Sequence, residues 1–117
     1  YLRALRIRHS IAVHADRIFS DYDALVSPTR PTPAPLADRP WTKTAEERDA
    51  DPLGEFGSCI GLPAISIPIG LTKDDLPVGL QIVGRAYEEN VILSVANAYQ
   101  ELTDWHTSHP LDLIENL

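Results

Sequence analysis

Two short apolar runs, residues 64–69 and 78–83, alternate with period two on either side of a turn-rich segment. Such alternation is typical of β-strands, because successive side chains point to opposite faces of a sheet. One face of the first run carries isoleucine at every second position, and the matching face of the second carries Val78, Leu80 and Ile82. The two runs therefore predict an antiparallel hairpin with one apolar face.

The opposite face of this hairpin carries mostly small residues, namely Ala64, Ser66, Pro68, Gly79 and Gln81. Small side chains allow another backbone or a helix to approach the sheet closely. Pro68 has no backbone N–H, so its strand is expected to be an edge strand or to be bulged at this position.

Two other segments have the spacing of amphipathic helices. In residues 2–19 an apolar stripe is formed by Ala4, Ile7, Ile11, Ala15 and Ile18. In residues 88–102 one face is formed by Ile92, Val95, Ala96, Tyr99 and Leu102. Glu88 and Glu89 fall in the first turn of that helix, where they complement its dipole.

Between the first helix and the hairpin, residues 23–27 predict a brief buried strand closed by Pro28. A proline-rich stretch follows, which favours an extended surface connection. The sequence thus predicts one α/β unit with two main helices, a short strand and a β-hairpin. Its parts are a helix (1–20), the strand and proline-rich loop (23–52), the hairpin region (53–84), and a helix with its tail (88–117).

Composition excludes several classes of protein. The 117 residues carry a net charge of −7, which argues against nucleic-acid binding, because phosphate contacts require a basic surface. No apolar run approaches the roughly 20 residues that cross a bilayer. The single cysteine suggests a reducing compartment, and we expect a cytoplasmic location. Because methionine is absent, we also expect this chain to be a fragment that lacks its encoded start.

Residues with catalytic or metal-binding chemistry do not form a recognisable set. Ser58 and Ser66 lack the flanking glycines of a nucleophile elbow. Cys59 lies in an apolar stretch, where a lone cysteine is usually a small packing residue. The tail contains two histidines, His106 and His109, with Asp104 nearby, but a catalytic zinc site usually needs a third ligand and an ordered element, so we do not expect zinc here. We therefore expect no catalytic residue, metal or cofactor in this chain.

A resemblance to a known family adds a function. The strings Gly61-Leu-Pro-Ala-Ile-Ser-Ile-Pro-Ile-Gly70 and Leu76-Pro-Val-Gly-Leu-Gln-Ile-Val-Gly-Arg85 closely resemble the C-terminal end of amidase signature enzymes. Upstream, Asp23-Ala-Leu-Val-Ser-Pro-Thr29 is similar to a strand and proline turn of that family, and Thr103-Asp-Trp-His106 is similar to its closing segment. These matches occur in the family's order across nearly the whole chain.

The resemblance implies a mixed sheet flanked by helices and an enzyme that cleaves amide carbon–nitrogen bonds with a serine, cis-serine, lysine triad. The triad's glycine- and serine-rich segment does not occur in these 117 residues, so the fragment alone should be inactive. The segment around residues 54–61 is implied to approach the acyl pocket. We name Phe56, Ser58 and Cys59 as candidate substrate-binding residues, with packing of the following turn as their alternative role.

Two alternatives to a free amidase stay open, namely the A subunit of a glutamine-dependent aminoacyl-tRNA amidotransferase and an inactive binding module with the amidase fold. In such A subunits the stretch before Gly-Leu-Pro-Ala is longer and holds an acidic residue thought to grip glutamine. Here only Gly54 to Ile60 fill it, with Glu55 as the sole acid, which favours the free amidase. The expected partners are a small-molecule amide, the rest of the amidase domain and, as an open option, further copies in a homo-oligomer; no membrane binding is expected.

A further departure from the family's pattern lies in the turn between the two apolar runs. Asp74 and Asp75 stand where the family often has a glycine before Leu76-Pro77. Aspartate tolerates left-handed backbone, so the turn is expected to survive.

Overall fold

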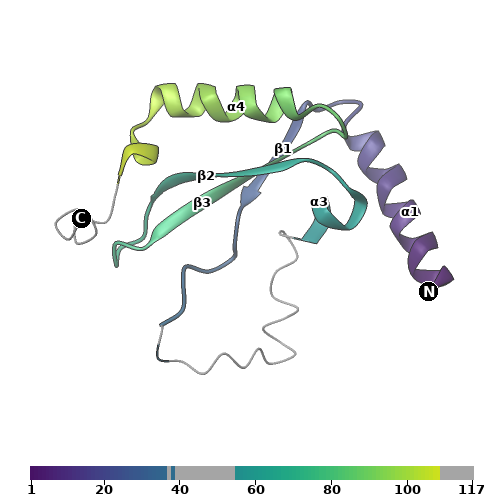
Figure 1. Ribbon diagram of the computed structural model, residues 1–117, viewed down its shortest axis with the longest axis horizontal. Helices are drawn as coiled ribbons and strands as arrows, with labels where there is room; N and C mark the ends of the chain where they lie inside the picture. Colours follow the sequence, from purple (N-terminus) through teal and green to yellow (C-terminus); the bar gives the residue numbers. More distant parts are fainter. Residues whose placement is uncertain (37, 39–54, 109–117) are drawn as a thin grey trace.

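The computed structural model describes residues 1–36, 38 and 55–108, and every structural statement below concerns these residues. The whole of the expected proline-rich loop beyond residue 38 lies outside them, as do His109 and the end of the tail. The elements, in chain order, are α1 (Leu2–Ile18), β1 (Ala24–Pro28), α3 (Glu55–Ile60), β2 (Ala64–Leu71), β3 (Pro77–Gly84), α4 (Glu89–Leu102) and the 3-10 turn η1 (Trp105–Thr107) (Figure 1). The predicted α/β class is confirmed.

The three strands form one antiparallel sheet in the order β1-β3-β2. The predicted hairpin is confirmed, with Ile65 opposite Ile82 and Ile67 opposite Leu80. As expected from Pro68, β2 is an edge strand in this part of the chain, and its register shifts between Pro68 and Gly70.

The turn between β2 and β3 tolerates its two aspartates. Asp75 adopts a φ of 56°, the left-handed region that aspartate enters more readily than most residues. The Thr72 amide donates to the Leu76 carbonyl at 2.8 Å, and Thr72 Oγ1 accepts from the Asp74 and Leu76 amides at 3.2 Å each. The turn is therefore stabilised by the hydrogen bonds of Thr72, and the left-handed backbone of Asp75 allows the chain to reverse its direction.

Helix α4 lies across one face of the sheet (Figure 1). Their contact buries a core of Ile67, Ile82, Ile92 and Ala96, with Ile82 fully inaccessible to solvent. The predicted face of α4 is only partly right, because Val95 is 39% exposed and Leu102 is 84% exposed. A three-stranded sheet offers too little width to cover the whole apolar face of the helix.

The other face of the sheet carries a second cluster of buried residues at one end. It consists of Ala15, Phe19 and Val83, with Leu25, Phe56, Ile60 and Leu62 packed around them. Helices therefore contact both faces, as the family resemblance implied. Leu25 lies directly opposite Val83 in the register, which places β1 in this cluster as well.

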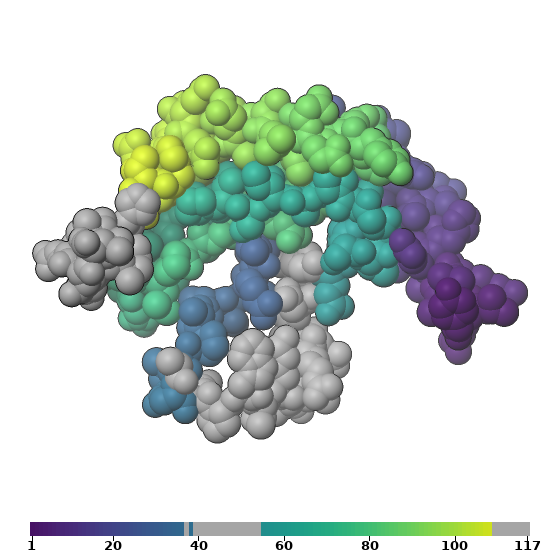
Figure 2. Space-filling view, in the orientation of Figure 1, coloured from purple at the N-terminus to yellow at the C-terminus, as the bar shows by residue number. Residues whose placement is uncertain are grey.

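The apolar stripe expected to be buried on α1 is mostly exposed. Ile7 is 52% exposed and Ile18 is 40% exposed, whereas Ala15 and the unpredicted Phe19 are both 1% exposed. Helix α1 projects away from the sheet, and only its C-terminal end reaches the core (Figures 1 and 2). Which residues of α1 are buried therefore depends on where the helix ends and the chain turns toward β1.

Strand β1 also differs from expectation, since it is half-buried and not fully buried. Val26 is 62% exposed although its neighbour across the ladder, Ile82, is fully buried. The reason is that α4 covers Ile82 and does not extend over Val26.

Arg85, which follows β3, links the end of α1 to the start of α4. Its guanidinium donates to the Phe19 carbonyl and forms an ion pair with Glu88 at 3.2 Å. A helix C-terminus presents carbonyls without intrahelical partners and favours a nearby cation. Arg85 thus fixes the direction of α1 relative to the sheet.

Candidate functional site

The predicted substrate-binding residues lie on α3, a helix that sequence reasoning did not predict. Its glycine, Gly57, is buried, and a Cβ there would lie 3.5 Å from Val83 Cγ1. A Cβ at that distance would make an ordinary van der Waals contact, so the helix backbone packs against β3 at Gly57 with room for a small side chain. A short helix interrupted by glycine is thus held in place by packing and not by intrinsic propensity.

The structure separates Phe56 from Ser58 and Cys59. Phe56 is half-buried and packs against the cluster of Ala15, Phe19 and Val83. This contact supports its alternative role, packing the segment that leads into β2.

Ser58 and Cys59 are both exposed, and Cys59 is a free thiol. Ser58 Oγ donates to the Glu55 carbonyl within the same helix at 3.4 Å. Both side chains are accessible to a ligand, and substrate binding by Phe56, Ser58 and Cys59 stays a prediction.

A polar strip crosses the sheet on the face opposite α4. In the register Ser27 lies opposite Gln81, which lies opposite Ser66, so the three side chains share one face. Next to them, Thr29 Oγ1 and Ser66 Oγ are hydrogen-bonded at 2.6 Å. Sequence reasoning noted Ser66 and Gln81 as small or uncharged residues but missed Thr29, which lies in the connection beyond β1.

Gly79 makes this hydroxyl pair possible. A Cβ at Gly79 would lie 2.7 Å from Thr29 Oγ1 and 2.9 Å from Ser66 Oγ, both closer than real Cβ atoms approach. The Thr29 amide also donates to the Gly79 carbonyl at 2.8 Å. The glycine therefore lets two hydroxyl side chains meet above the middle strand.

We expect Gly79→Ala to lower the free energy of unfolding by about 1 kcal/mol, because the methyl group separates the Thr29 and Ser66 hydroxyls and costs roughly one hydrogen bond. The measurement is urea unfolding of the complete protein that carries this chain. The matched control is the double variant Thr29→Ala/Ser66→Ala, which removes both hydroxyls and in which the added Gly79→Ala should cost less. An equal cost in both backgrounds would contradict the account of Gly79.

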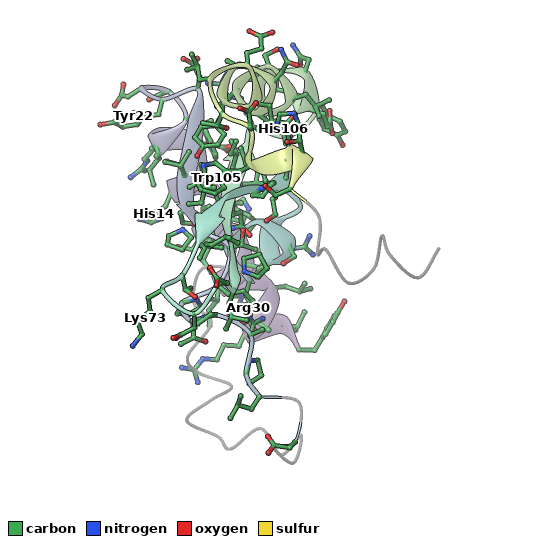
Figure 3. The ribbon with its side chains drawn as sticks, turned by 90° about the vertical axis from the view of Figure 1, so that its left-hand side faces the viewer. His14, Tyr22, Arg30, Lys73, Trp105 and His106 are labelled. Atoms are coloured by element: carbon green, nitrogen blue, oxygen red, sulfur yellow. The ribbon has the colours of Figure 1, made fainter. Side chains whose placement is uncertain are left out.

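The chemistry of this surface is that of hydrogen bonding and not of nucleophilic catalysis. Serine is a weak nucleophile until a general base removes its proton, and the Ser66 hydroxyl is paired with another hydroxyl. His14, Lys73 and His106, labelled in Figure 3, come from three different elements, namely α1, the β2–β3 turn and η1. Over residues 1–36, 38 and 55–108, no group of three or more His, Cys, Asp or Glu could hold a metal ion.

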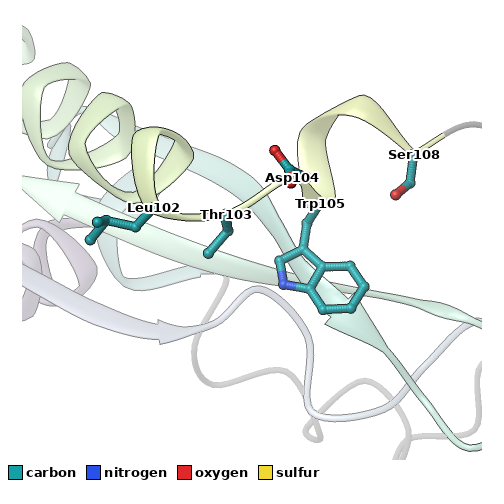
Figure 4. A pocket seen from close by; sticks show the side chains of 5 residues that line it. All are labelled: Leu102, Thr103, Asp104, Trp105 and Ser108. Carbon is teal, nitrogen blue, oxygen red and sulfur yellow. The ribbon is translucent and has the colours of Figure 1, made fainter.

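A shallow pocket lies where α4 passes into η1, lined by Leu102, Thr103, Asp104, Trp105 and Ser108 (Figure 4). Two of its polar groups make local hydrogen bonds: Thr103 Oγ1 donates to the Tyr99 carbonyl at 3.1 Å, and the Asp104 backbone carbonyl accepts from Thr107 Oγ1 at 2.7 Å. The indole of Trp105 lies 3.9 Å from where a Cβ on Gly70 would stand. This region therefore anchors the tail against β2.

None of the described helices is long and apolar enough to cross a membrane.

Comparison with known proteins identifies the family. The family model named Amidase matches residues 1–93. The chain therefore belongs to the amidase family, and the family resemblance predicted from the sequence is confirmed.

Similar curated proteins are named as A subunits of glutamyl-tRNA(Gln) amidotransferase. The one from Clostridium botulinum is 39% identical over an alignment that covers 94% of this chain and 22% of that protein. The one from Microcystis aeruginosa is 40% identical over the same share of this chain, which spans 23% of it. The chain thus spans less than a quarter of the length of these relatives.

Two solved structures share the fold. The glutamyl-tRNA(Gln) amidotransferase A subunit from Thermotoga maritima matches 76% of this chain with a TM-score of 0.66 and 30% identity, and the match covers 19% of that chain. A crystal structure of an amidase matches 86% of this chain with a TM-score of 0.75 and 24% identity, covering 24% of that chain.

Proposed function

We propose that this chain is the C-terminal part of an enzyme that hydrolyses the carbon–nitrogen bond of small carboxamides. The observation that carries the proposal is the match of residues 1–93 to the amidase family. It is supported by the fold shared with a solved amidase and by a Ser66 hydroxyl that is paired with a threonine. The shared fold and the paired hydroxyl fit a chain that forms part of the protein structure around an active site, while the catalytic residues lie elsewhere in the protein.

In this proposal the catalytic groups come from sequence outside these 117 residues. A serine attacks the amide carbonyl, a lysine relays protons through a cis-serine, and backbone amides stabilise the oxyanion. This chain contributes the α4-covered hairpin and the segment of α3. Of the candidates Phe56, Ser58 and Cys59, the exposed Ser58 and Cys59 are the residues through which α3 reaches the acyl pocket, and Phe56 holds the helix in place by packing.

A second candidate is the A subunit of a glutamine-dependent aminoacyl-tRNA amidotransferase. The names of the relatives from Clostridium botulinum and Microcystis aeruginosa favour it. The short stretch from Gly54 to Ile60, with Glu55 as its sole acid, favours the free amidase. Both candidates share the amide-hydrolysing step and differ in what receives the released ammonia.

The test is hydrolysis by the complete protein of a panel of small carboxamides that includes glutamine, with ammonia release as the readout. We expect turnover by the complete protein and none by the 117 residues alone. Glutaminase activity that rises with charged tRNA and a B-type partner protein would select the amidotransferase. An inert complete protein would contradict the proposal and leave an inactive module with the amidase fold.

The partners we propose are a small-molecule amide substrate and the remainder of the amidase domain, with further copies in a homo-oligomer as an open option. We also propose a cytoplasmic location, because the sequence has a single cysteine and therefore no disulfide framework of the kind typical of oxidising compartments.

A further inference from the structure

The cluster of buried residues on the face of the sheet opposite α4 is also the base on which α3 rests. We call it the α3 cluster, and its members are Ala15, Phe19, Val83, Leu25, Phe56, Ile60 and Leu62. Phe56 and Ile60 lie on α3 itself, four positions apart, and therefore share one face of that helix. Ser58 and Cys59, on the same helix, are exposed. The α3 cluster thus holds one side of the helix and leaves the side with Ser58 and Cys59 accessible.

Helix α3 has little stability of its own. It contains six residues, which is less than two helical turns, and isolated helices of this length do not persist in water. Its C-terminal end is fixed by the Gly57 carbonyl, which accepts from the Gly61 and Leu62 amides at 2.9 Å each. Gly61 adopts a φ of 79°, the left-handed conformation that ends many helices. The position of α3 is therefore set by this short link to β2 and by packing on the α3 cluster.

Phe19 is the largest side chain of the α3 cluster that is fully buried, at 1% exposure. Its backbone carbonyl accepts a hydrogen bond from the guanidinium of Arg85, which is also paired with Glu88. The Phe19 backbone is therefore tied to the end of β3, and its ring occupies a fixed place among the residues on which α3 packs.

The core on the other face of the sheet has no such role. Its buried members are Ile67, Ile82, Ile92 and Ala96, and among the described residues none of its members or packed neighbours comes from α3. The two cores therefore differ in what they can influence. Both stabilise the sheet, and the α3 cluster alone also supports the helix that carries Ser58 and Cys59.

We propose that Phe19 is a positioning residue for substrate selection. Through the α3 cluster it fixes where the exposed side of α3 stands, and thereby which acyl groups the enzyme accepts. The inference rests on the proposed function, in which Ser58 and Cys59 reach the acyl pocket. It assigns acyl selectivity to the α3 cluster and stability alone to the core under α4.

The first test reports the position of α3 without any need for activity. Cys59 is exposed and is the single cysteine of these 117 residues, so its rate of alkylation by iodoacetamide, followed on its own peptide by mass spectrometry, reports on α3 in the native complete protein. We expect Phe19→Leu to raise this rate by roughly threefold or more, because a segment that loses packing contacts opens more readily.

The matched control is Ile92→Val, a conservative truncation at a position that is 3% exposed in the other core. It should leave the alkylation rate of Cys59 unchanged. An unchanged rate in Phe19→Leu, or an equal acceleration in both variants, would overturn the proposal.

The second test measures selectivity as the ratio of kcat/KM for hexanamide to kcat/KM for propionamide in the complete protein. We expect Phe19→Leu to shift this ratio toward hexanamide by about fivefold or more, because α3 can recede into the space left by the ring and acyl chain length is read by the pocket's depth. Ile92→Val should keep the ratio of the unaltered protein. A ratio that Phe19→Leu leaves unchanged or shifts toward propionamide would overturn the proposal, since a purely structural role would affect both amides equally.

If Phe19→Leu does not fold, Ile60→Val takes its place in both tests with the same expected directions, because it removes a methyl group from the packed side of α3. The outcomes also separate this inference from the proposed function. A complete protein that hydrolyses both amides with unaltered selectivity in the variant refutes the inference alone. A complete protein that hydrolyses no amide refutes the proposed function, and the alkylation of Cys59 then decides whether Phe19 positions α3.

Discussion

Replacing Ile82 with alanine should lower the free energy of unfolding by about 2–5 kcal/mol, the range for truncating a buried aliphatic side chain. Ile82 is fully buried at the centre of the sheet, between Ile67 and the α4 residues Ile92 and Ala96. Loss of its side chain leaves a cavity that neither strand nor helix can close without breaking the ladder. Chemical denaturation of the complete protein measures this effect.

The matched control for Ile82→Ala is Leu93→Ala, on the same helix–sheet unit but at a position that is 54% exposed. Its cost should be much smaller, because less apolar surface leaves the core. A loss of less than about 1 kcal/mol for Ile82→Ala would contradict the assignment of this core, since buried truncations rarely cost so little.

Replacing Gly84 with alanine should destabilise the protein by about 1–3 kcal/mol through overpacking. A Cβ at Gly84 would lie 2.5 Å from Ile92 Cγ2, and both residues are buried where β3 leads into α4. The side chain of Ile92 is held by Ile67, Ile82 and Ala96 and has little room to move. Urea unfolding of the complete protein gives the value.

A double-mutant cycle tests the cause of the Gly84→Ala effect. Ile92→Ala removes the methyl group that the new Cβ would meet, so Gly84→Ala should cost less in that background. Strict additivity of the two losses would show that the clash with Ile92 is not the reason, and that strain elsewhere at the end of β3 is.

The sequence pattern predicted the hairpin well, because the features that define a hairpin depend on residues close together in the sequence. Alternating apolar residues fixed which faces of β2 and β3 are apolar, and Pro68 marked both the edge and the register shift. Asp75 showed that the turn tolerates a residue other than glycine. Each of these features depends on the backbone chemistry of a few neighbouring residues.

Long-range packing accounts for what the sequence did not predict. The buried row of α1 ends on Phe19 and not Ile18, because the helix meets the sheet only at its last turn. Val26 is exposed because α4 stops short of it. Such outcomes depend on how far separate elements extend, which helical periodicity does not encode.

The candidate site was predicted even less completely. Helix α3 packs beside Val83 through Phe56 and Ile60, a contact between segments that periodicity cannot reveal. The Thr29–Ser66 pair arises from residues 37 positions apart and from the missing side chain of Gly79. A signal existed in the small residues on the back of the hairpin, but it did not identify the partner that approaches them.

The most direct test of the central claim, that the nucleophile lies outside this chain, is labelling of the complete protein with a fluorophosphonate probe and identification of the modified residue by mass spectrometry. The account predicts a single labelled serine in sequence outside these 117 residues, with loss of amide hydrolysis in step with labelling. Modification of Ser58 or Ser66, or no labelling at all, would contradict it.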